Sequence, residues 1–184
     1  MIDRDSEIVG LAFVLFMAGV ESTSALLSTA FRELALNPDQ RAALLADPSQ
    51  ISAAVEEALR FDAPLQVAGR TTTRDVELHG VTIPAEQRVF LIYGSANRDE
   101  RQYEDPDRFD ISRRQKRHMS FSEGLHGCLG APLARLEARV ALEVALPRLG
   151  DYVISGPMQQ YRSTPNMRVL DHLPISFTPA GRNS

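Results

Sequence analysis

The sequence has only one cysteine, Cys128, in 184 residues. A lone cysteine excludes an internal disulfide and gives no indication of a disulfide-stabilised secreted domain. With four scattered histidines and no CxxC or HxxxH pair, the sequence also lacks the ligand spacing of a zinc site. If this sulfur has a chemical role, it acts as the only thiol of the chain.

The sequence also lacks an excess of positive charge and a long apolar segment. The net charge is −4 and the pI about 5.6, so we expect no nucleic-acid partner. No signal sequence opens the chain, and the apolar run Ile8–Val20 is shorter than the roughly 20 residues that span a bilayer. The sequence therefore predicts a cytoplasmic protein with no membrane partner, and its 43% hydrophobic residues suffice for a core.

Glycines surround the cysteine in the stretch Phe121-Ser-Glu-Gly-Leu-His-Gly-Cys-Leu-Gly130, and a helical pattern follows directly. A turn containing Gly124, Gly127 and Gly130 lets the backbone approach a flat ligand closely. At the start of a helix, the dipole and the unpaired backbone amides favour the thiolate form of a cysteine. The pattern indicates that the sulfur is ionised and bound to a metal.

Two other interpretations of Cys128 stay open from the residues alone. A lone cysteine is commonly a small buried hydrophobic residue. It could also be a nucleophile activated by a histidine, although His126 is only two residues away and such pairs usually meet through the fold. A haem-free cysteine protein therefore remains an alternative.

The pattern Phe-x-x-Gly-x-His-x-Cys-x-Gly, followed by 131–135, resembles the haem-ligand loop of the cytochrome P-450 family, which are haem-thiolate monooxygenases. The resemblance implies a haem b cofactor (iron protoporphyrin IX) with Cys128 as the iron ligand. It also implies that Phe121, Gly124 and Gly130 belong to the cofactor-binding loop.

Three further positions of this resemblance concern the haem surroundings. Arg70 and His126 match residues that bind the haem propionates, although an exposed strand charge is the alternative for Arg70. Ser122 departs from the pattern, because the family usually has a further glycine there. We therefore expect the turn to be less open at this position.

Residues 5–36 predict one long, largely apolar and central helix that ends at Asn37-Pro38. Its middle contains Glu21, Ser22 and Thr23, which resemble the acid–alcohol pair of the family's oxygen-binding groove. The resemblance implies that these residues deliver protons to the bound oxygen. A tolerated polar patch at a helix contact is the alternative. Ser22 stands where threonine is usual, and a serine lacks the methyl group that holds the rotamer.

A Glu-x-x-Arg pattern, Glu57 and Arg60, lies in a predicted helix that Ser49 can cap and that reaches Phe61. A spacing of three places both charges on one helix face, and a solvated pair of little energetic worth is the usual explanation. The pattern resembles the family's buried pair, for which Arg108 would be the third member of a charge-assisted network.

The remaining pattern predicts short strands, further helices and a final hairpin. The expected fold class is mainly α with small antiparallel β-sheets. Because the resemblance covers nearly the whole chain in the family's order, residues 1–184 resemble the C-terminal half of the cytochrome P-450 fold, a partial domain whose N-terminal half is absent. The expected helices are 38–46, 93–99 and 129–149, and the expected strands are 66–73, 76–78, 88–92 and a hairpin within 152–177.

The resemblance implies a monooxygenase that inserts one oxygen atom of O2 into a small apolar organic substrate, with electrons from a ferredoxin-type donor. Leu65–Gly69 and the tip of the final hairpin would line the substrate pocket. The basic run Arg113–His118 would face the sulfur side of the haem, where an acidic donor could dock. The alternative is a truncated, non-catalytic haem-binding fragment.

Overall fold

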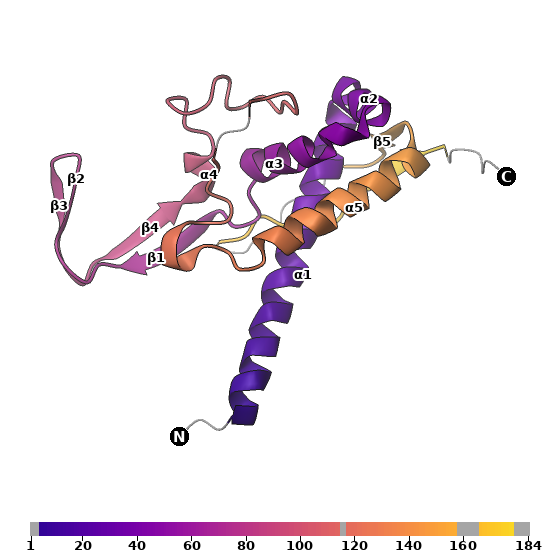
Figure 1. The fold of residues 1–184 in the computed structure, drawn as a ribbon. Helices are drawn as coiled ribbons and strands as arrows, with labels where there is room; N and C mark the ends of the chain where they lie inside the picture. Colours follow the sequence, from indigo (N-terminus) through magenta and orange to yellow (C-terminus); the bar gives the residue numbers. More distant parts are fainter. Residues whose placement is uncertain (1–3, 115–116, 158–165, 179–184) are drawn as a thin grey trace.

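A computed structural model of the chain describes residues 4–114, 117–157 and 166–178. Helices dominate the fold, and short strands connect or follow them (Figure 1). In chain order the elements are α1 (Arg4–Leu36), α2 (Pro38–Ala46), the 3-10 turn η1 (Pro48–Gln50), α3 (Ile51–Phe61), β1 (Val67–Thr71), β2 (Val76–Leu78), β3 (Val81–Ile83), β4 (Arg88–Ile92), α4 (Tyr93–Ala96), the 3-10 turn η2 (Gly124–His126), α5 (Ala131–Leu149), β5 (Tyr152–Ile154) and β6 (Ile175–Phe177).

The strands form three antiparallel pairs, β1 with β4, β2 with β3, and β5 with β6. The turn between β2 and β3 is His79-Gly80, and both residues have positive φ angles, 51° and 78°. Such angles match the right-handed twist of a two-residue hairpin. The predicted fold class, mainly α with small antiparallel sheets, is confirmed.

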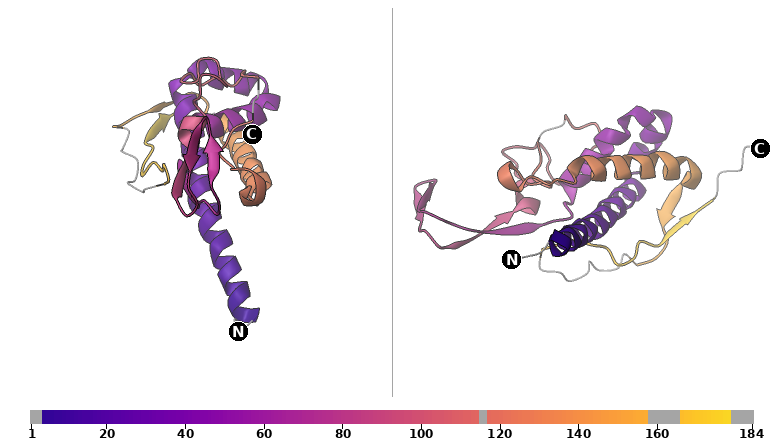
Figure 2. Two further views of the ribbon diagram at one scale, coloured as in Figure 1. Left: turned by 90° about the vertical axis from the view of Figure 1, so that its left-hand side faces the viewer. Right: turned by 60° about the horizontal axis from the view of Figure 1, so that its bottom comes forward.

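The core lies where the C-terminal half of α1 meets α3 and α5, and the two turned views of Figure 2 show α5 lying alongside α1. Leu34, Ala58 and Leu142 are fully buried there. Tyr152 of β5 closes one end, because its hydroxyl donates a hydrogen bond of 2.9 Å to the carbonyl of Phe31. This bond fixes the final hairpin to α1. Burial in the same low-dielectric site raises the pKa of Tyr152.

Buried arginines join the outer elements to this core. Arg41 of α2 donates to the carbonyl of Leu34 at 3.2 Å and to the carbonyl of Tyr152 at 2.8 Å. Asp62, just after α3, accepts from Arg32 of α1 and from Arg168, each at 3.1 Å. Hydrogen bonds to charged groups are stronger than neutral ones, so these contacts hold α1, α2 and the end of the chain together.

Helix α1 is central only in its second half. Its first half projects from the body of the fold (Figure 1), and Phe13 and Phe16 are 63% and 68% exposed. The apolar part of α1 is longer than the run Ile8–Val20, because an 18-residue window of this helix has a mean hydropathy of 1.7. By length and composition alone α1 could cross a membrane, but the core helix of a soluble protein passes the same test.

Two helix starts differ from the expected ones. The helix after the cysteine begins at Ala131 instead of Leu129, since the chain before it forms a turn. The residue that caps the segment before α3 is Asp47, whose carboxylate accepts the Ser49 N–H at 3.1 Å. A carboxylate is as good a cap as a serine hydroxyl, and it lies one residue before Pro48.

Candidate functional site

Cys128 lies between η2 and α5 and is exposed. Its N–H donates to the carbonyl of Phe121 at 2.8 Å, and its own carbonyl accepts the N–H of Ala131 at 3.3 Å. The two bonds close the loop upon itself and hold the sulfur just before the first turn of α5. The sulfur therefore lies next to the N-terminal end of α5, which is the positive end of the helix dipole.

The loop depends on glycine at specific points. Gly124 has a φ of +65°, which only glycine adopts without cost. A Cβ on Gly127 would come within 3.3 Å of the Gly124 carbonyl oxygen, which is tighter than ordinary contacts. A Cβ on Gly130 would lie 3.9 Å from the sulfur of Cys128, which is an ordinary van der Waals contact, so the packing within this chain does not itself require glycine there.

Ser122 adopts a glycine-like backbone conformation, with a φ of 55°. A non-glycine residue in this region costs roughly 1–2 kcal/mol. The buried Tyr93 offsets part of this cost, because its hydroxyl donates to the Ser122 oxygen at 2.9 Å. The loop therefore keeps its left-handed turn at the position where the sequence departs from the family pattern.

A cavity of about 320 Å³ opens between this loop and α1. It brings together the predicted residues Phe121, His126 and Cys128 from the loop with Ser22 and Thr23 from α1. The other walls are mostly apolar and come from α1, α3, α5 and the segments beside them: Ala18, Leu26, Leu59, Pro64, Leu65, Ser120, Ser122, Ala134 and Met167.

Two predicted site residues do not line this cavity. Arg70 lies on β1, and its guanidinium donates to the carbonyl of Gly69 at 2.8 Å. Glu21 is half-buried on α1 and is not part of the cavity wall. Both residues lie on elements that the sequence predicts, but neither side chain contributes to the wall of the cavity around Cys128.

The segment around Met167 reaches the cavity beside the residues that precede β1. Leu65 and Met167 form an antiparallel bridge, and the N–H of Gln66 donates to the carbonyl of Asn166 at 2.8 Å. Of the predicted stretch Leu65–Gly69, Leu65 lines the cavity and Gly69 does not. The predicted hairpin tip falls in residues 158–165, which lie outside the described part of the chain.

The α1 wall presents hydroxyl groups to the cavity. The Ser22 hydroxyl donates to the carbonyl of Ala18 at 2.6 Å, one turn earlier in the same helix. Its proton is thus engaged with the backbone while its lone pairs stay available as acceptors. The helix remains continuous through this point.

The donor set of the cavity fits a haem. Among residues 4–114, 117–157 and 166–178, no three His, Cys, Asp or Glu side chains gather into a group that could hold a metal ion. The side chains of this cavity that could bind a metal are therefore at most Cys128 and His126, and a metal bound by Cys128 needs further ligands from elsewhere. A soft thiolate beside apolar walls and a glycine loop suits iron whose remaining ligands come from a flat macrocycle.

A second cluster, Glu56, His118 and Arg135, supports the loop from behind. Arg135 of α5 donates to the two carboxylate oxygens of Glu56 on α3 at 2.5 and 2.9 Å, and the His118 Nε2 atom lies 3.1 Å from the same carboxylate. The guanidinium carbon of Arg135 lies 4.5 Å from the ring centre of Phe121. This cation–π contact clamps the first residue of the cysteine loop.

The cluster strongly lowers the pKa of the Glu56 carboxylate. Burial by itself raises the pKa of Glu56, but the hydrogen bonds and charges of His118 and Arg135 outweigh it and hold the pKa at about 2. Sequence reasoning missed this cluster. The signal that could have pointed to it is the second acid, Glu56, directly before Glu57 on a helix whose other face is apolar.

The Glu-x-x-Arg pair is buried as predicted, with side chains 4% and 3% exposed. Arg60 donates to both oxygens of Glu57, at 2.8 and 2.7 Å. It also donates to the carbonyls of Asn97 and Pro106, at 3.0 and 2.9 Å. The pair thereby fastens α3 to the irregular segment that leads to the cysteine loop.

The predicted third member of this network is wrong. Arg113, not Arg108, approaches Glu57, with its Nε atom 3.3 Å from the carboxylate. The guanidinium of Arg108 is 66% exposed and pairs with Asp110, while the Arg108 carbonyl accepts hydrogen bonds from Arg60 and Arg113. The backbone of Arg108 faces the network, so its side chain points outward.

This arrangement also corrects the predicted docking surface. Arg113 is 12% exposed and spends its donors on Glu57 and on the carbonyls of Glu104, Asp105 and Arg108, so it cannot meet a partner protein. Arg117 pairs with Glu123. Residues 115–116 of the basic run lie outside the described part, and in the rest of the run Arg114 and Arg117 are exposed.

Known proteins similar to this chain share this arrangement of elements. A family model described as "Cytochrome P450" matches residues 4–150. The chain is 45% identical over 166 residues to "Cytochrome p450 CYP199A2" of Rhodopseudomonas palustris, covering 90% of this chain and 40% of that protein. It is 39% identical to the 6-deoxyerythronolide B hydroxylase of Saccharopolyspora erythraea, covering 92% of this chain and 42% of that protein.

A solved structure has the same fold over nearly the whole length of this chain. The crystal structure of substrate-free CYP109E1 from Bacillus megaterium superposes with a TM-score of 0.92 at 33% identity, covering 97% of this chain and 46% of that chain. The chain therefore spans less than half the length of the relatives that it matches.

Proposed function

Because the chain belongs to the cytochrome P-450 family, we propose that it carries the thiolate side of a haem-thiolate monooxygenase site. The reaction would insert one oxygen atom of O2 into a small apolar organic substrate. The observation that carries the proposal is the position of Cys128, the only thiol, on an apolar cavity whose opposite wall is the hydroxyl-bearing turn of α1. Relatives named as cytochromes P-450 and as a hydroxylase support it.

In this proposal the loop residues hold the cofactor, haem b. Cys128 is the iron ligand, and a haem with a thiolate ligand supplies oxygen activation, since the thiolate favours cleavage of the O–O bond. Phe121, Gly124 and Gly130 give the loop the shape that lets its backbone approach the macrocycle. The apolar walls exclude water from the substrate side.

Two cationic or titratable side chains would bind the propionates. His126 lines the cavity on the loop side. Arg70 of β1 would exchange its bond to the Gly69 carbonyl for a charge-assisted bond to a carboxylate, which is the stronger of the two. Both residues would then fix the rotation of the cofactor in its plane.

Proton delivery would fall to α1. Ser22 and Thr23 line the cavity. Each hydroxyl group can accept a proton at its own oxygen atom and pass a proton on. Glu21, the neighbouring acid outside the cavity wall, would exchange protons with solvent. Because the Ser22 hydroxyl donates to Ala18, its rotation away from that carbonyl is part of the transfer.

Electrons would come from a ferredoxin-type donor that approaches the sulfur side in the cytoplasm. Arg114 and Arg117 are the exposed cations of the basic run in the described part, so they are the side chains of that run that an acidic donor would meet. We propose neither a nucleic-acid nor a membrane partner.

A non-catalytic haem-binding fragment is the alternative, and one observation favours it. The chain spans 40–46% of the length of its relatives, and the first half of α1 is exposed along its apolar residues. The cavity residues would then bind haem without the enclosure that oxygen chemistry needs.

Reconstitution with haem tests the ligand assignment. The reduced carbonyl complex of the wild-type chain should show the displaced Soret band of a thiolate haem. The variant Cys128→His keeps a possible iron ligand but removes the thiolate, so it should bind haem and lose the displaced band. A displaced band that survives in Cys128→His would overturn the assignment, as would a wild-type chain that binds haem without one.

A further inference from the structure

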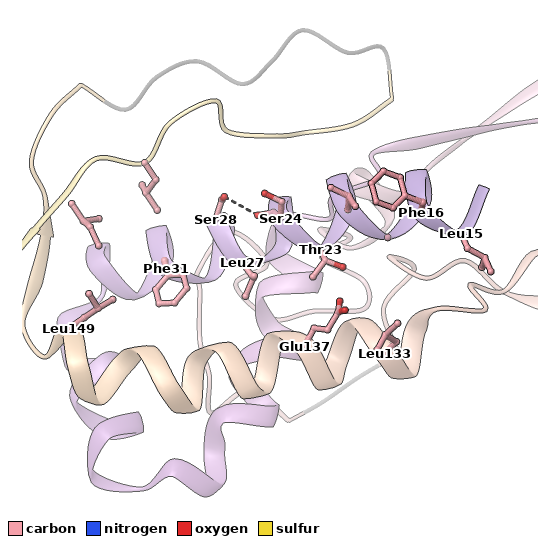
Figure 3. A pocket seen from close by; sticks show the side chains of 14 residues that line it. Leu15, Phe16, Thr23, Ser24, Leu27, Ser28, Phe31, Leu133, Glu137 and Leu149 are labelled. Atoms are coloured by element: carbon pink, nitrogen blue, oxygen red, sulfur yellow. Dashed lines mark hydrogen bonds between the residues drawn. The ribbon is translucent and has the colours of Figure 1, made fainter. Parts of the chain in front are cut away.

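Two cavities beside α1 differ in how their walls are held. The larger one, of about 760 Å³, lies between α1 and α5, and Figure 3 shows most of its wall residues on these two long helices. The cavity around Cys128 takes part of its wall from Leu65 and Met167, which lie in two short segments outside the helices and sheets. A helix fixes its side chains through its own backbone hydrogen bonds. A short segment depends on the groups behind it.

Backbone hydrogen bonds tie these two segments to each other. The N–H of Gln66 donates to the carbonyl of Asn166 at 2.8 Å, and the N–H of Arg168 donates to the carbonyl of Pro64 at 2.9 Å. Between them lies the isolated antiparallel bridge of the two wall residues, which belongs to none of the three sheets. A single bridge without neighbouring strands contributes little stability by itself, so the wall needs a further hold.

The side chain of Arg168 lies on the other side of its segment from that of Met167. Successive side chains of an extended segment point to opposite sides, and Met167 lines the cavity whereas Arg168 does not. The Nη1 atom of Arg168 donates instead to the Oδ1 atom of Asp62 at 3.1 Å. The side chain of Asp62 is 2% exposed and that of Arg168 is 43% exposed. A buried carboxylate therefore holds the wall from its outer side.

Asp62 is itself fixed to two helices. Its N–H donates to the carbonyl of Ala58 at the end of α3 at 3.1 Å, and its Oδ2 atom accepts from Arg32 of α1 at 3.1 Å. Arg32 is held in turn by Glu33 at 2.6 Å. One carboxylate thus receives two guanidinium groups, one from a helix that lines the cavity and one from the segment that carries Met167. Such charge-assisted hydrogen bonds are short and fixed in geometry.

We propose that Asp62 positions this wall of the substrate cavity. By linking Arg168 to Arg32 of α1, its carboxylate fixes the place of Met167 and thereby the space in which an organic molecule can lie beside the Cys128 loop. Asp62 is a positioning residue, because it does not line the cavity and acts through Arg168. The inference deepens the proposed function and rests on it, since the wall matters to a substrate only if the cavity binds one.

Arg168→Ala is the variant that tests this link, because it removes the guanidinium and leaves Asp62 paired with Arg32. Arg139→Ala is the matched control. The side chain of Arg139 is also 43% exposed and pairs with a carboxylate, that of Glu143 at 2.8 Å, but it does not line this cavity. Arg168→Lys keeps the positive charge and should retain most of the link, since a single contact does not need the fork of the guanidinium.

Amide hydrogen exchange of the 184-residue chain measures the link without haem. In Arg168→Ala the amide of Gln66 should lose about fivefold or more of its protection, because the segment that accepts its hydrogen bond is released. The amide of Leu142, in the core part of α5, should keep its protection within about twofold, since the change is local. Arg139→Ala and Arg168→Lys should leave both amides within about twofold of the wild type. Unchanged protection of Gln66 in Arg168→Ala would overturn the proposal, as would an equal loss at Leu142.

Two nitrogen ligands of iron measure the effect on the cavity after haem is supplied. Imidazole is small, whereas 4-phenylimidazole adds a phenyl ring that needs an apolar wall. Arg168→Ala should raise the Kd of 4-phenylimidazole about threefold or more relative to that of imidazole, because Met167 is no longer held in place. Equal changes for both ligands, or the same change in Arg139→Ala, would contradict the positioning role. A wild-type chain that binds no haem would count against the proposed function, and the exchange of Gln66 would then decide this inference.

Discussion

Arg135 donates two hydrogen bonds to the carboxylate of Glu56, at 2.5 and 2.9 Å, and so joins α5 to α3 directly behind the cysteine loop. The same guanidinium lies over the ring of Phe121, whose carbonyl holds the N–H of Cys128. A chain of contacts therefore runs from the buried face of α3 to the residue that we assign as iron ligand. Disturbing Glu56 should loosen the loop as well as the helix pair.

We expect Glu56 to make the stability of the chain depend on acid pH. The pKa of Glu56 is about 2 in the folded chain and near 4.5 when it is unperturbed. A lowered pKa contributes stability above the unfolded value, which is lost as the pH falls from about 4.5 toward 2, and the full contribution is about 3 kcal/mol. Urea unfolding of the wild type and of Glu56→Gln should differ by a constant amount above pH 5.5.

Below that pH the two stabilities should converge, because protonation of Glu56 in the wild type removes the charged partner of His118 and Arg135, which Glu56→Gln lacks at every pH. Glu143→Gln is the control, because its exposed pair with Arg139 contributes only about 0.3–0.5 kcal/mol. A difference between wild type and Glu56→Gln that is unchanged at pH 3 would contradict the assigned role of the carboxylate.

Arg113 and Arg108 should differ strongly in their effect on stability. Arg113→Ala removes a guanidinium that is 12% exposed and bonded to Glu57 and to backbone carbonyls, so it should cost roughly 3–5 kcal/mol. Arg108→Ala removes an exposed pair with Asp110 and should cost under about 1 kcal/mol. Chemical denaturation of both variants measures this, and equal losses would show that the network does not extend to Arg113.

The sequence predicts the parts of the site that are local in the chain. Gly124 has the positive φ that a glycine-rich turn predicts, and Glu57 and Arg60 follow from helix spacing. The identity of the third arginine could not be predicted, because Arg108 and Arg113 lie in an irregular segment without periodicity. In this segment Arg108 contributes its backbone carbonyl to the network, whereas Arg113 contributes its side chain. The cluster of Glu56 is equally invisible, since its partners come from separate segments that only the fold brings together.

A similar limit applies to Arg70 and to α1. Strand periodicity places Arg70 correctly on β1, but the direction of a long side chain depends on a partner that the chain does not contain. The apolar pattern of α1 predicts a buried helix, whereas its first half is exposed because burial needs neighbours outside this sequence. The apolar pattern thus indicates that the first half of α1 is suited to burial, but it does not show whether this chain contains an element that covers it.

Tyr93 and Ser122 should show coupled effects on stability. Tyr93→Phe removes the hydroxyl that bonds to Ser122 and should cost about 1 kcal/mol in the wild-type background. Ser122→Gly relieves the left-handed conformation but also loses this bond, so its net effect should be within about 1 kcal/mol of zero. In the Ser122→Gly background, Tyr93→Phe should then cost almost nothing. A double-mutant cycle by denaturation gives the coupling, and additive losses would rule out a contribution of the hydrogen bond.

The isolated 184-residue chain should not hydroxylate a substrate, although it contains the proposed thiolate ligand and proton-delivery residues. Activation of oxygen requires a closed, dry pocket, so that the reactive species meets substrate instead of water. Here the first half of α1, which continues from the Ser22 wall of the cavity, is exposed to solvent along residues such as Phe13 and Phe16. Each square ångström of apolar surface left open costs about 25 cal/mol, which favours association over a stable open pocket.

The measurement supplies haem, a ferredoxin and its reductase, O2 and a panel of small apolar compounds to the isolated chain and to a chimera. In the chimera, the part of the Rhodopseudomonas relative that lies outside its match is joined to this chain. Electrons consumed by the isolated chain should appear as reduced oxygen species without hydroxylated product. Regioselective hydroxylation should appear in the chimera and disappear when Cys128→His removes its thiolate. Coupled hydroxylation by the isolated chain would show that the exposed half of α1 is not needed as a wall of the pocket, and that the cavity around Cys128 is sufficient by itself.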